Sequence, residues 1–283
     1  MEPLSAACCL ACLQLGEPNE PRMPPSWNRP EVSLAPSGRS DDLALAARFG
    51  LAVAARRDPT QWQLVRSTRT LALCSPDAMG GMHLELDVNS GPLARRLRSS
   101  RRDEPLPRAI GLPRRQAPPR VVDATAGLCR DAMVLAQLGC QVVAIESVPA
   151  LAALAQAAIS GSGFEDRLQI VAADSVAWLA RLAPGDAPDV VYLDPMFAEG
   201  NRAQVKKDMQ VCRALAGPPG DPGALFAAAR SAARERVVVK RHPDLPPLAD
   251  GASFAVVGER VRFDVYLQPG QGPGGPLSGS PGQ

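Results

Sequence analysis

Acidic side chains follow four short aliphatic runs in the second half of the chain, at or just after the point where each run ends. The acids are, in order, Asp123, Glu146, Asp174 and Asp194. In a sheet of parallel strands the carboxyl ends lie along one edge, so we expect these carboxylates to converge on one crevice. Such a crevice suits a ligand that carries hydroxyl and amino groups and a positive charge. Each acid alone could be only a helix cap or a strand-end turn, but four in this order are a more specific signal.

The stretch Val121–Asp131 has the pattern of a strand, a tight loop and the start of a helix. Two valines lead into Asp123, small residues follow through Gly127, and a helix is expected from 132 to 138. The single glycine does not fit the G-x-G-x-x-G fingerprint of dinucleotide-binding folds. The stretch resembles instead the first motif of S-adenosylmethionine (AdoMet) methyltransferases. The alternative is an ordinary strand end capped by Asp123, with Gly127 easing the turn.

With AdoMet as the ligand, each strand-end group has a chemically suitable partner. Glu146 can accept hydrogen bonds from both ribose hydroxyls, and Asp174 with Ser175 can receive the adenine amino group. The Ala126-Gly127 turn lets the backbone approach the methionine part, where a bulkier turn would not fit. Asp123 bonds this turn or orients the cofactor amine.

The most specific local motif is Asp194-Pro195-Met196-Phe197, which resembles the D/N-P-P-Y/F loop of methyltransferases that modify exocyclic amines. The lone pair of a base amine is delocalised into the ring, so the amine is a poor nucleophile. The Asp194 carboxylate and the Pro195 carbonyl can accept its two N–H bonds and orient the lone pair toward the methyl group. Phe197 can stack on the base. Met196 departs from the usual second proline, and the alternative is an Asp-Pro turn with Phe197 in the core.

From residue 120 onward, strand and helix patterns alternate, which predicts a mostly parallel α/β sheet of the class I AdoMet methyltransferase type. Strands are expected at 121–122, 142–145, 168–171, 190–193 and 236–240, and helices at 149–160, 176–182, 203–215 and 224–233. Residues 254–257 and 261–267 predict a terminal hairpin that contains an antiparallel strand. We therefore place a methyltransferase domain at residues 120–268 and a disordered tail at 269–283.

The first part of the chain predicts a smaller unit. Residues 1–39 are rich in proline and lack a sustained period, which indicates a disordered leader. Residues 40–119 are expected to form a small α/β subdomain, with a helix that ends near Gly50 and strands at 61–65, 70–73 and 83–88. Its last part is read as a proline-broken linker with one helical block at 93–98.

Charge is unevenly distributed, although the formal net charge of the 283 residues is only +2. Nine arginines and two acids lie between Arg95 and Arg120. Guanidinium groups suit phosphate binding, so this segment could contact nucleic acid, or it could be only a solvated charged linker.

Other ligand and targeting signals are weak. Seven scattered cysteines do not indicate a disulfide framework. Cys9 and Cys12 form one C-x-x-C with no second pair, and His83 and His242 stand alone, so no metal site is predicted. No apolar run is long enough to cross a membrane, and the start lacks a basic region, which favours a cytoplasmic protein.

Four motifs in one register resemble the bacterial ribosomal RNA small subunit methyltransferase J family: residues 122–128, 192–197, 205–209 and 237–241. The resemblance covers roughly residues 40–268. It implies AdoMet-dependent methylation of the N2 amine of one guanosine in 16S ribosomal RNA, either naked or in the small subunit. Apart from the resemblance, a monomer is expected. The resemblance places cofactor contacts on seven residues: Arg130, Asp131, Glu146, Ser147, Asp174, Ser175 and Asp194. It makes four basic residues candidates for RNA phosphate: Lys206, Lys207, Lys240 and Arg241.

Three departures from the family pattern keep two alternatives open. Cys129 replaces a glycine, Ser147 replaces a basic residue, and the arginine-rich segment replaces a glycine-rich one. The first two motivate the hypothesis of a catalytically weak RNA-binding or ribosome assembly factor. The Asp194 motif alone would also fit a DNA adenine-N6 methyltransferase, but Met196 and the lack of a target-recognition domain argue against it.

Overall fold

The computed structural model describes residues 29–195, 207–218 and 220–271, with the side chain of Lys207 left out. Within these residues the larger sheet has the strand order β10-β11-β9-β8-β5-β6-β7. Its strands are β5 (Arg120–Asp123), β6 (Gln141–Glu146), β7 (Leu168–Ala172), β8 (Val190–Leu193), β9 (Arg236–Arg241), β10 (Phe254–Val257) and β11 (Arg262–Leu267). Strands β5 to β9 are parallel, and β11 and β10 add an antiparallel hairpin. The predicted fold class is confirmed.

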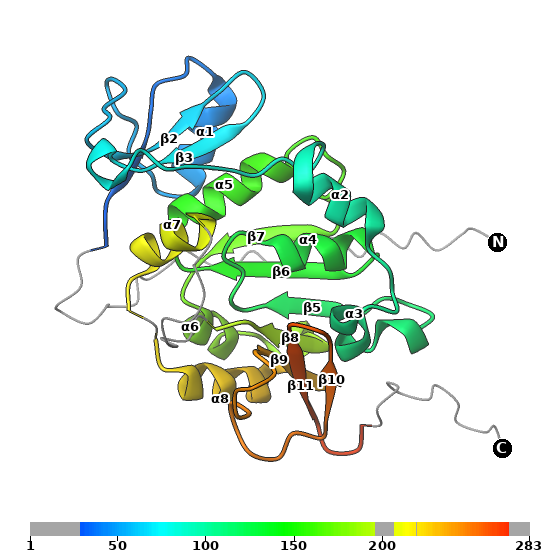
Figure 1. The fold of residues 1–283 in the computed structure, drawn as a ribbon. Helices are drawn as coiled ribbons and strands as arrows, with labels where there is room; N and C mark the ends of the chain where they lie inside the picture. Colours follow the sequence, from blue (N-terminus) through cyan, green and yellow to red (C-terminus); the bar gives the residue numbers. More distant parts are fainter. Residues whose placement is uncertain (1–28, 196–206, 219, 272–283) are drawn as a thin grey trace, which may run out of the picture.

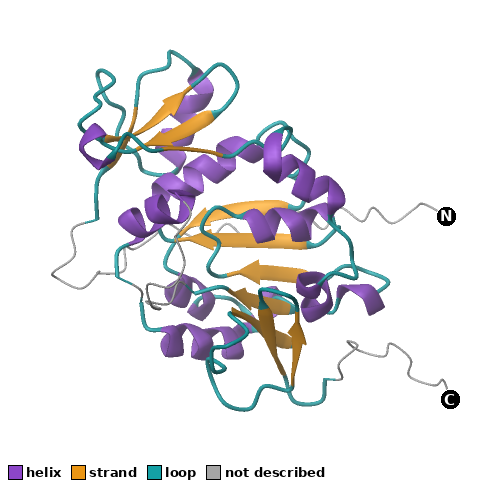
Figure 2. Ribbon diagram, viewed as in Figure 1, coloured by secondary structure: helices purple, strands orange, loops and turns teal. Residues whose placement is uncertain are grey.

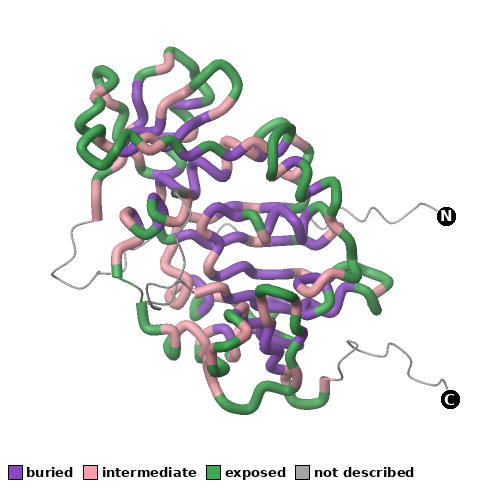
Figure 3. Tube along the Cα trace, viewed as in Figure 1, coloured by how far each residue is buried: buried purple, intermediate pink, exposed green. Residues whose placement is uncertain are grey.

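Side chains alternate between the two faces of this sheet, as the two-residue period of a strand requires. Val121, Tyr192 and Val238 belong to the core on one face, and Val122 and Val191 to the core on the other. Helices cover both faces (Figure 2). On the first face lie α4 (Arg130–Gln137) and α5 (Pro149–Ile159), and on the second α6 (Ser175–Ala180) and α8 (Pro222–Ala232). The central strands are accordingly buried, and exposed residues gather on the outer loops and helix faces (Figure 3).

A second, smaller sheet has the order β1-β2-β3-β4. It contains β1 (Val32–Leu34), β2 (Trp62–Arg66), β3 (Leu71–Cys74) and β4 (His83–Glu85), and α1 (Ser40–Arg48) accompanies it. The expectation that residues up to 39 have no regular structure was wrong for β1. This three-residue strand pairs in parallel with β2, and sequence pattern could not reveal a partner 30 residues away.

Helix α5 lies between the two sheets (Figure 1). It contacts β6 and β7 of the larger sheet and β3 and α1 of the smaller unit. Most of its residues are buried, from Ala150 through Ala155. A helix that is apolar all round is expected where both sides are covered. The two sheets therefore share one continuous core.

The arginine-rich segment is more regular than expected. The helical block predicted at 93–98 is confirmed as α2 (Gly91–Ser99), and a second helix, α3 (Pro105–Ile110), follows, with a short 3-10 turn after it. The prolines do not break this segment, contrary to what the sequence pattern predicts. Pro105 and Pro107 instead lie in the first turn of α3, where a helix needs no N–H donor from them. Helix α2 packs on α4, and α3 packs on β10 and β11.

Helix α7 (Lys207–Ala216) follows β8 in the described part of the chain. Strands β5, β6 and β7 point toward the side of the molecule where α7 lies (Figure 1). No helix among the described residues is long and apolar enough to cross a membrane.

Candidate active site at the carboxyl ends of the strands

The loop after β5 is built by its own backbone and by Asp123. The Asp123 carboxylate is buried and accepts the N–H of Thr125 at 3.1 Å. Of the two roles expected for Asp123, this contact corresponds to bonding the turn. Gly127 has φ of +52°, and a Cβ added there would meet open space. The loop thus exposes backbone beside the strand ends, which fits close approach by a ligand such as the methionine part of AdoMet.

Cys129 ends this loop in the left-handed conformation, with φ of 54° and ψ of 20°, as the N-cap of α4. It is the one non-glycine residue with positive φ in the described part of the chain. Its side chain is fully buried, and burial raises the pKa of its thiol well above the usual range. Glycine adopts this backbone conformation without strain, whereas a residue with a Cβ does not.

Glu146, at the end of β6, accepts two backbone N–H groups. One oxygen accepts from Gly127 and the other from Val148, both at 2.7 Å. Burial raises the pKa of Glu146, although the two N–H groups favour the charged form. Each oxygen keeps a second lone pair, so the carboxylate can still accept from a ligand diol.

Asp174 and Ser175 lie where β7 gives way to α6. Asp174 caps α6 by accepting the N–H of Ala177 at 2.8 Å. The Ser175 hydroxyl donates to the carbonyl of Ala124 at 2.6 Å and so ties α6 to the loop after β5. These contacts match the helix-cap alternative for Asp174 and bring both residues to the same edge as Glu146.

An ionic cluster joins three elements at this edge. Lys240, near the end of β9, donates to Asp131 Oδ2 in α4 and to Asp194 Oδ2 after β8, each at 2.9 Å. The hydroxyl of Tyr192 donates to the same Asp131 oxygen at 2.7 Å. The backbone N–H of Asp194 donates to Thr125 Oγ1 at 2.5 Å, which fixes the start of the Asp194 loop against the loop after β5.

The cluster sets the charge of its members. Burial alone would raise the pKa of Asp131, but the Lys240 ammonium outweighs it and the pKa is lowered. The pKa of Asp194 is raised, because burial outweighs the opposing effect of Lys240. Burial, with Asp131 and Asp194 nearby, raises the pKa of Asp123 to about 8. Asp123 is therefore largely protonated at neutral pH.

Two further predicted cofactor residues make contacts at the rim. Arg130 pairs with Asp208 of α7 at 2.5 Å. The carbonyl of Ser147 accepts a hydrogen bond from Arg29, which precedes β1. Sequence reasoning missed Arg29, and it also missed Thr125 and Tyr192, whose positions read as loop and core residues.

The predicted RNA-binding residues are not found on one free surface. Lys240 is bound by two carboxylates. Arg241 is buried and donates to the carbonyl of Pro246 at 3.1 and 2.9 Å, so it does not present its guanidinium as an exposed phosphate ligand. Lys206 and Phe197 lie outside the described residues, as does the side chain of Lys207.

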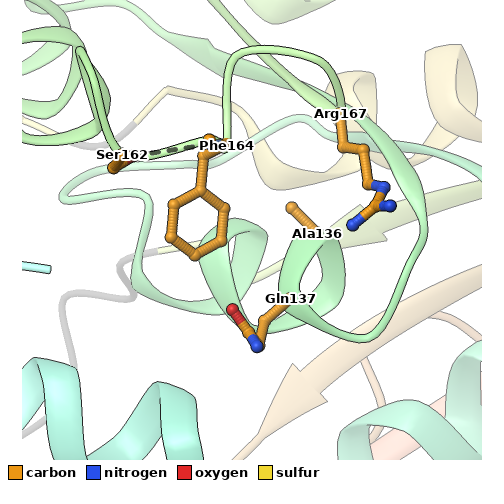
Figure 4. Close-up of a pocket in the computed structure, with 6 residues that line it drawn as sticks. Ala136, Gln137, Ser162, Phe164 and Arg167 are labelled. Carbon is orange, nitrogen blue, oxygen red and sulfur yellow. Dashed lines mark hydrogen bonds between the residues drawn. The ribbon is translucent and has the colours of Figure 1, made fainter.

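A small pocket elsewhere is separate from this site. It is lined by residues of the α4 end and of the loop before β7, among them Gln137, Phe164 and Arg167 (Figure 4). These residues precede the strands and lie at the opposite edge of the sheet from Glu146 and Asp194. Among the described residues, no cluster of His, Cys, Asp or Glu side chains could hold a metal ion.

Comparison with known proteins agrees with the fold. Residues 44–268 match a family described as "Putative SAM-dependent methyltransferase". The crystal structure of a SAM-dependent methyltransferase from Neisseria gonorrhoeae superposes with a TM-score of 0.65 at 26% identity, over 88% of this chain and 100% of that one. The fold and the acidic strand ends thus define the class of S-adenosylmethionine-dependent methyltransferases.

Sequence relatives narrow the class to one family. The chain is 39% identical over 245 residues to the ribosomal RNA small subunit methyltransferase J of Thioalkalivibrio sulfidiphilus, covering 81% of this chain and 95% of that protein. It is 42% identical over 236 residues to the protein of that name from Alkalilimnicola ehrlichii, covering 79% and 89%. The chain belongs to the ribosomal RNA small subunit methyltransferase J family.

Proposed function

We propose that this protein transfers the methyl group of S-adenosylmethionine to the N2 amine of a guanosine in 16S ribosomal RNA. The observation that carries the proposal is the position of Asp194. Its backbone is held by Thr125, its Oδ2 is held by Lys240, and its side chain is 42% exposed. Within the described part of the chain, Oδ1 has no hydrogen-bond partner, so it can accept from a substrate amine.

The chemistry follows from that arrangement. When bound, the cofactor supplies an electrophilic methyl group on a positively charged sulfur. Asp194 Oδ1 and the carbonyl of Pro195 accept the two amine N–H groups and direct the nitrogen lone pair. Phe197 stacks on the base in this proposal. The bond from N2 to the methyl carbon would form as the carbon–sulfur bond breaks, with the neutral thioether as the leaving group, and the methylated amine would then lose one proton to water. No strong general base is required, because the Asp194 carboxylate can stabilise the positive charge on the amine until that proton leaves.

The acidic strand ends are proposed to hold the cofactor. Glu146 accepts from the ribose hydroxyls, and Asp174 with Ser175 faces the adenine. Ala126 and Gly127 flank the methionine part. Four further residues complete the proposed contacts as neighbours of these groups: Asp123, Arg130, Asp131 and Ser147. Lys240 neutralises one of the two carboxylates that it contacts, Asp131 and Asp194, and Asp123 is largely protonated near neutral pH. The cluster therefore carries one net negative charge, which matches the single positive charge of the sulfonium.

The proposed partner is 16S ribosomal RNA, which the names of the relatives support. Lys206 and Lys207 remain proposed phosphate contacts. We also propose a cytoplasmic location and a monomeric protein.

The test is methyl transfer from labelled S-adenosylmethionine to RNA from a bacterial strain that lacks the gene. Naked 16S RNA, small-subunit particles and duplex DNA are compared, and the product nucleoside is identified by mass spectrometry. The proposal expects N2-methylguanosine at one position in RNA or particles. Methyladenine in DNA would overturn it in favour of a DNA enzyme. Normal RNA binding without transfer would favour an assembly factor.

A further inference from the structure

The ammonium of Lys240 makes contacts that a surface RNA ligand would not make. It is 26% exposed and lies 2.9 Å from one oxygen of Asp131 and 2.9 Å from one oxygen of Asp194. Its stem rises from β9, between β8 and the hairpin, so the strand order fixes its position. An ammonium has three N–H donors, and two are used by these carboxylates. A phosphate would have to compete with both.

The partners of Lys240 are themselves held in place. Asp131 stands in the first turn of α4 and also accepts the Tyr192 hydroxyl at 2.7 Å, so its position is fixed from β8. Asp194 is fixed at its backbone by Thr125. Lys240 therefore connects a rigid carboxylate on one side to the Asp194 side chain on the other. This arrangement leaves one rotamer of Asp194 favoured, with Oδ2 toward Lys240 and Oδ1 away from it.

We propose that Lys240 is a positioning residue, which holds the Asp194 carboxylate charged and oriented so that Oδ1 can accept the substrate amine. The inference rests on the proposed function, and it replaces the expectation that Lys240 grips RNA phosphate. Without the ammonium, Asp131 and Asp194 would face each other as like charges, and Asp123 stands close to both. Asp131 or Asp194 would then take up a proton in addition to the one on Asp123, and Asp194 would lose its fixed orientation.

The groups around Asp194 predict the effect on pH dependence. Asp123 comes from β5, Asp131 from α4, Tyr192 from β8 and Lys240 from β9. Among the described residues, Lys240 stabilises the charged form of Asp194, whereas burial and the Asp131 carboxylate oppose it. Loss of the ammonium therefore raises the pH below which methyl transfer declines, that is, the acidic limb of the pH–rate profile.

The test compares three variants by transfer kinetics, cofactor calorimetry and RNA binding. Lys240→Met is expected to lower kcat at least about tenfold, the cost of a lost charged hydrogen bond, and to shift the acidic limb upward. Its affinity for RNA and the salt dependence of that affinity are expected to stay unchanged. Lys240→Arg, which keeps the charge, is expected to restore much of kcat and the original limb. Tyr192→Phe removes the other donor to Asp131 and is expected to leave the limb in place.

The outcomes separate this inference from the proposed function. If the parent protein methylates RNA but Lys240→Met keeps its kcat and pH profile, the positioning role is wrong while the function stands. If Lys240→Met mainly weakens RNA binding and lowers the salt slope by about one, Lys240 is a phosphate ligand after all. If Lys240→Met does not fold, Lys240→Gln, which keeps an N–H donor but no charge, takes its place. An acidic limb shifted to higher pH supports the role, and a limb that stays in place, as expected for Tyr192→Phe, overturns it.

Discussion

Glu146 accepts the backbone N–H of Gly127 across 19 residues of sequence, at 2.7 Å. The bond joins the end of β6 to the loop after β5, so the acid expected to hold the ribose also shapes the loop expected to border the methionine part. A change at Glu146 therefore acts on both parts of the proposed cofactor site.

Glu146→Gln is expected to weaken S-adenosylmethionine binding more than it weakens the fold. An amide has one acceptor oxygen, so it can keep only one of the bonds to Gly127 and Val148, and its NH2 group opposes the other N–H. The amide also offers the ribose hydroxyls a neutral acceptor in place of a charged one. The loss of one charged hydrogen bond to the ribose corresponds to about 1.5–3 kcal/mol, or roughly 10- to 100-fold in the Kd for S-adenosylmethionine. Calorimetry measures the affinity, and thermal unfolding without cofactor is the control. Equal cofactor affinity in the variant would contradict a ribose-side role.

The left-handed conformation of Cys129 predicts the relative stability of two substitutions. Cys129→Ala loses the buried sulfur but keeps a Cβ at φ of 54°, whereas Cys129→Gly loses both. Relief of left-handed strain is worth about 1 kcal/mol. We therefore expect the glycine variant to be more stable than the alanine variant, which is also the usual order of these two residues at an N-cap. Denaturant unfolding of both variants checks this, and a more stable alanine variant would show that the loop carries no strain.

Asp123 predicts a dependence of stability on pH. Its pKa is raised to about 8 in the folded protein by burial, and in the unfolded chain it is near the ordinary value of 3.8. The folded state therefore holds this proton more tightly, and the associated stability is lost as pH rises from about 4 toward 8. Asp123→Asn keeps an acceptor for Thr125 and removes the cost of ionisation. We expect it to be more stable than the parent at pH 9 and equal near pH 4, with a gap that grows by at most about 1.4 kcal/mol per pH unit. Urea unfolding across this range decides, and a constant gap would refute the assignment.

Exposed arginines of α2 are the expected RNA contacts in the arginine-rich segment. Within the described residues, Arg96 pairs with Glu104 and Arg101 with Asp103, whereas Arg95 and Arg98 are exposed, one turn apart, and have no acidic partner. Charge reversal of both is expected to weaken RNA binding about tenfold or more and to reduce its salt dependence. Filter binding at several salt concentrations measures this.

The matched control for that experiment is the reversal of Arg181 and Arg260, which are also exposed and lie on other parts of the surface. The two double variants have the same change in net charge. Equal weakening by both would show a non-specific effect of total charge, and the α2 face would then not be a contact.

Strand alternation and the acids at strand ends allowed the sheet and the edge of the site to be predicted, because both depend on local periodicity. The partners of those acids could not be predicted. Lys240 reaches Asp131 only because β9 lies beside β8, which is a property of strand order and not of spacing along the chain. Likewise, Tyr192 lies in an apolar strand and is predicted to be a core residue. The hydrogen bond from its hydroxyl to Asp131 is visible only in the structure. Helix α3 was missed because its prolines stand where a helix tolerates them.

Helix α5 is covered on two sides, because one side packs on the parallel strands β6 and β7 and the other packs on β3 and α1 of the smaller unit. Removal of about the first hundred residues would expose the side of α5 that contacts β3 and α1, and so leave an apolar surface beside the loop that follows Glu146. Heat or urea should accordingly unfold both sheets in a single transition. The amino-terminal part therefore supports the proposed methyl-transfer site through α5, as the strands that carry the acids do directly.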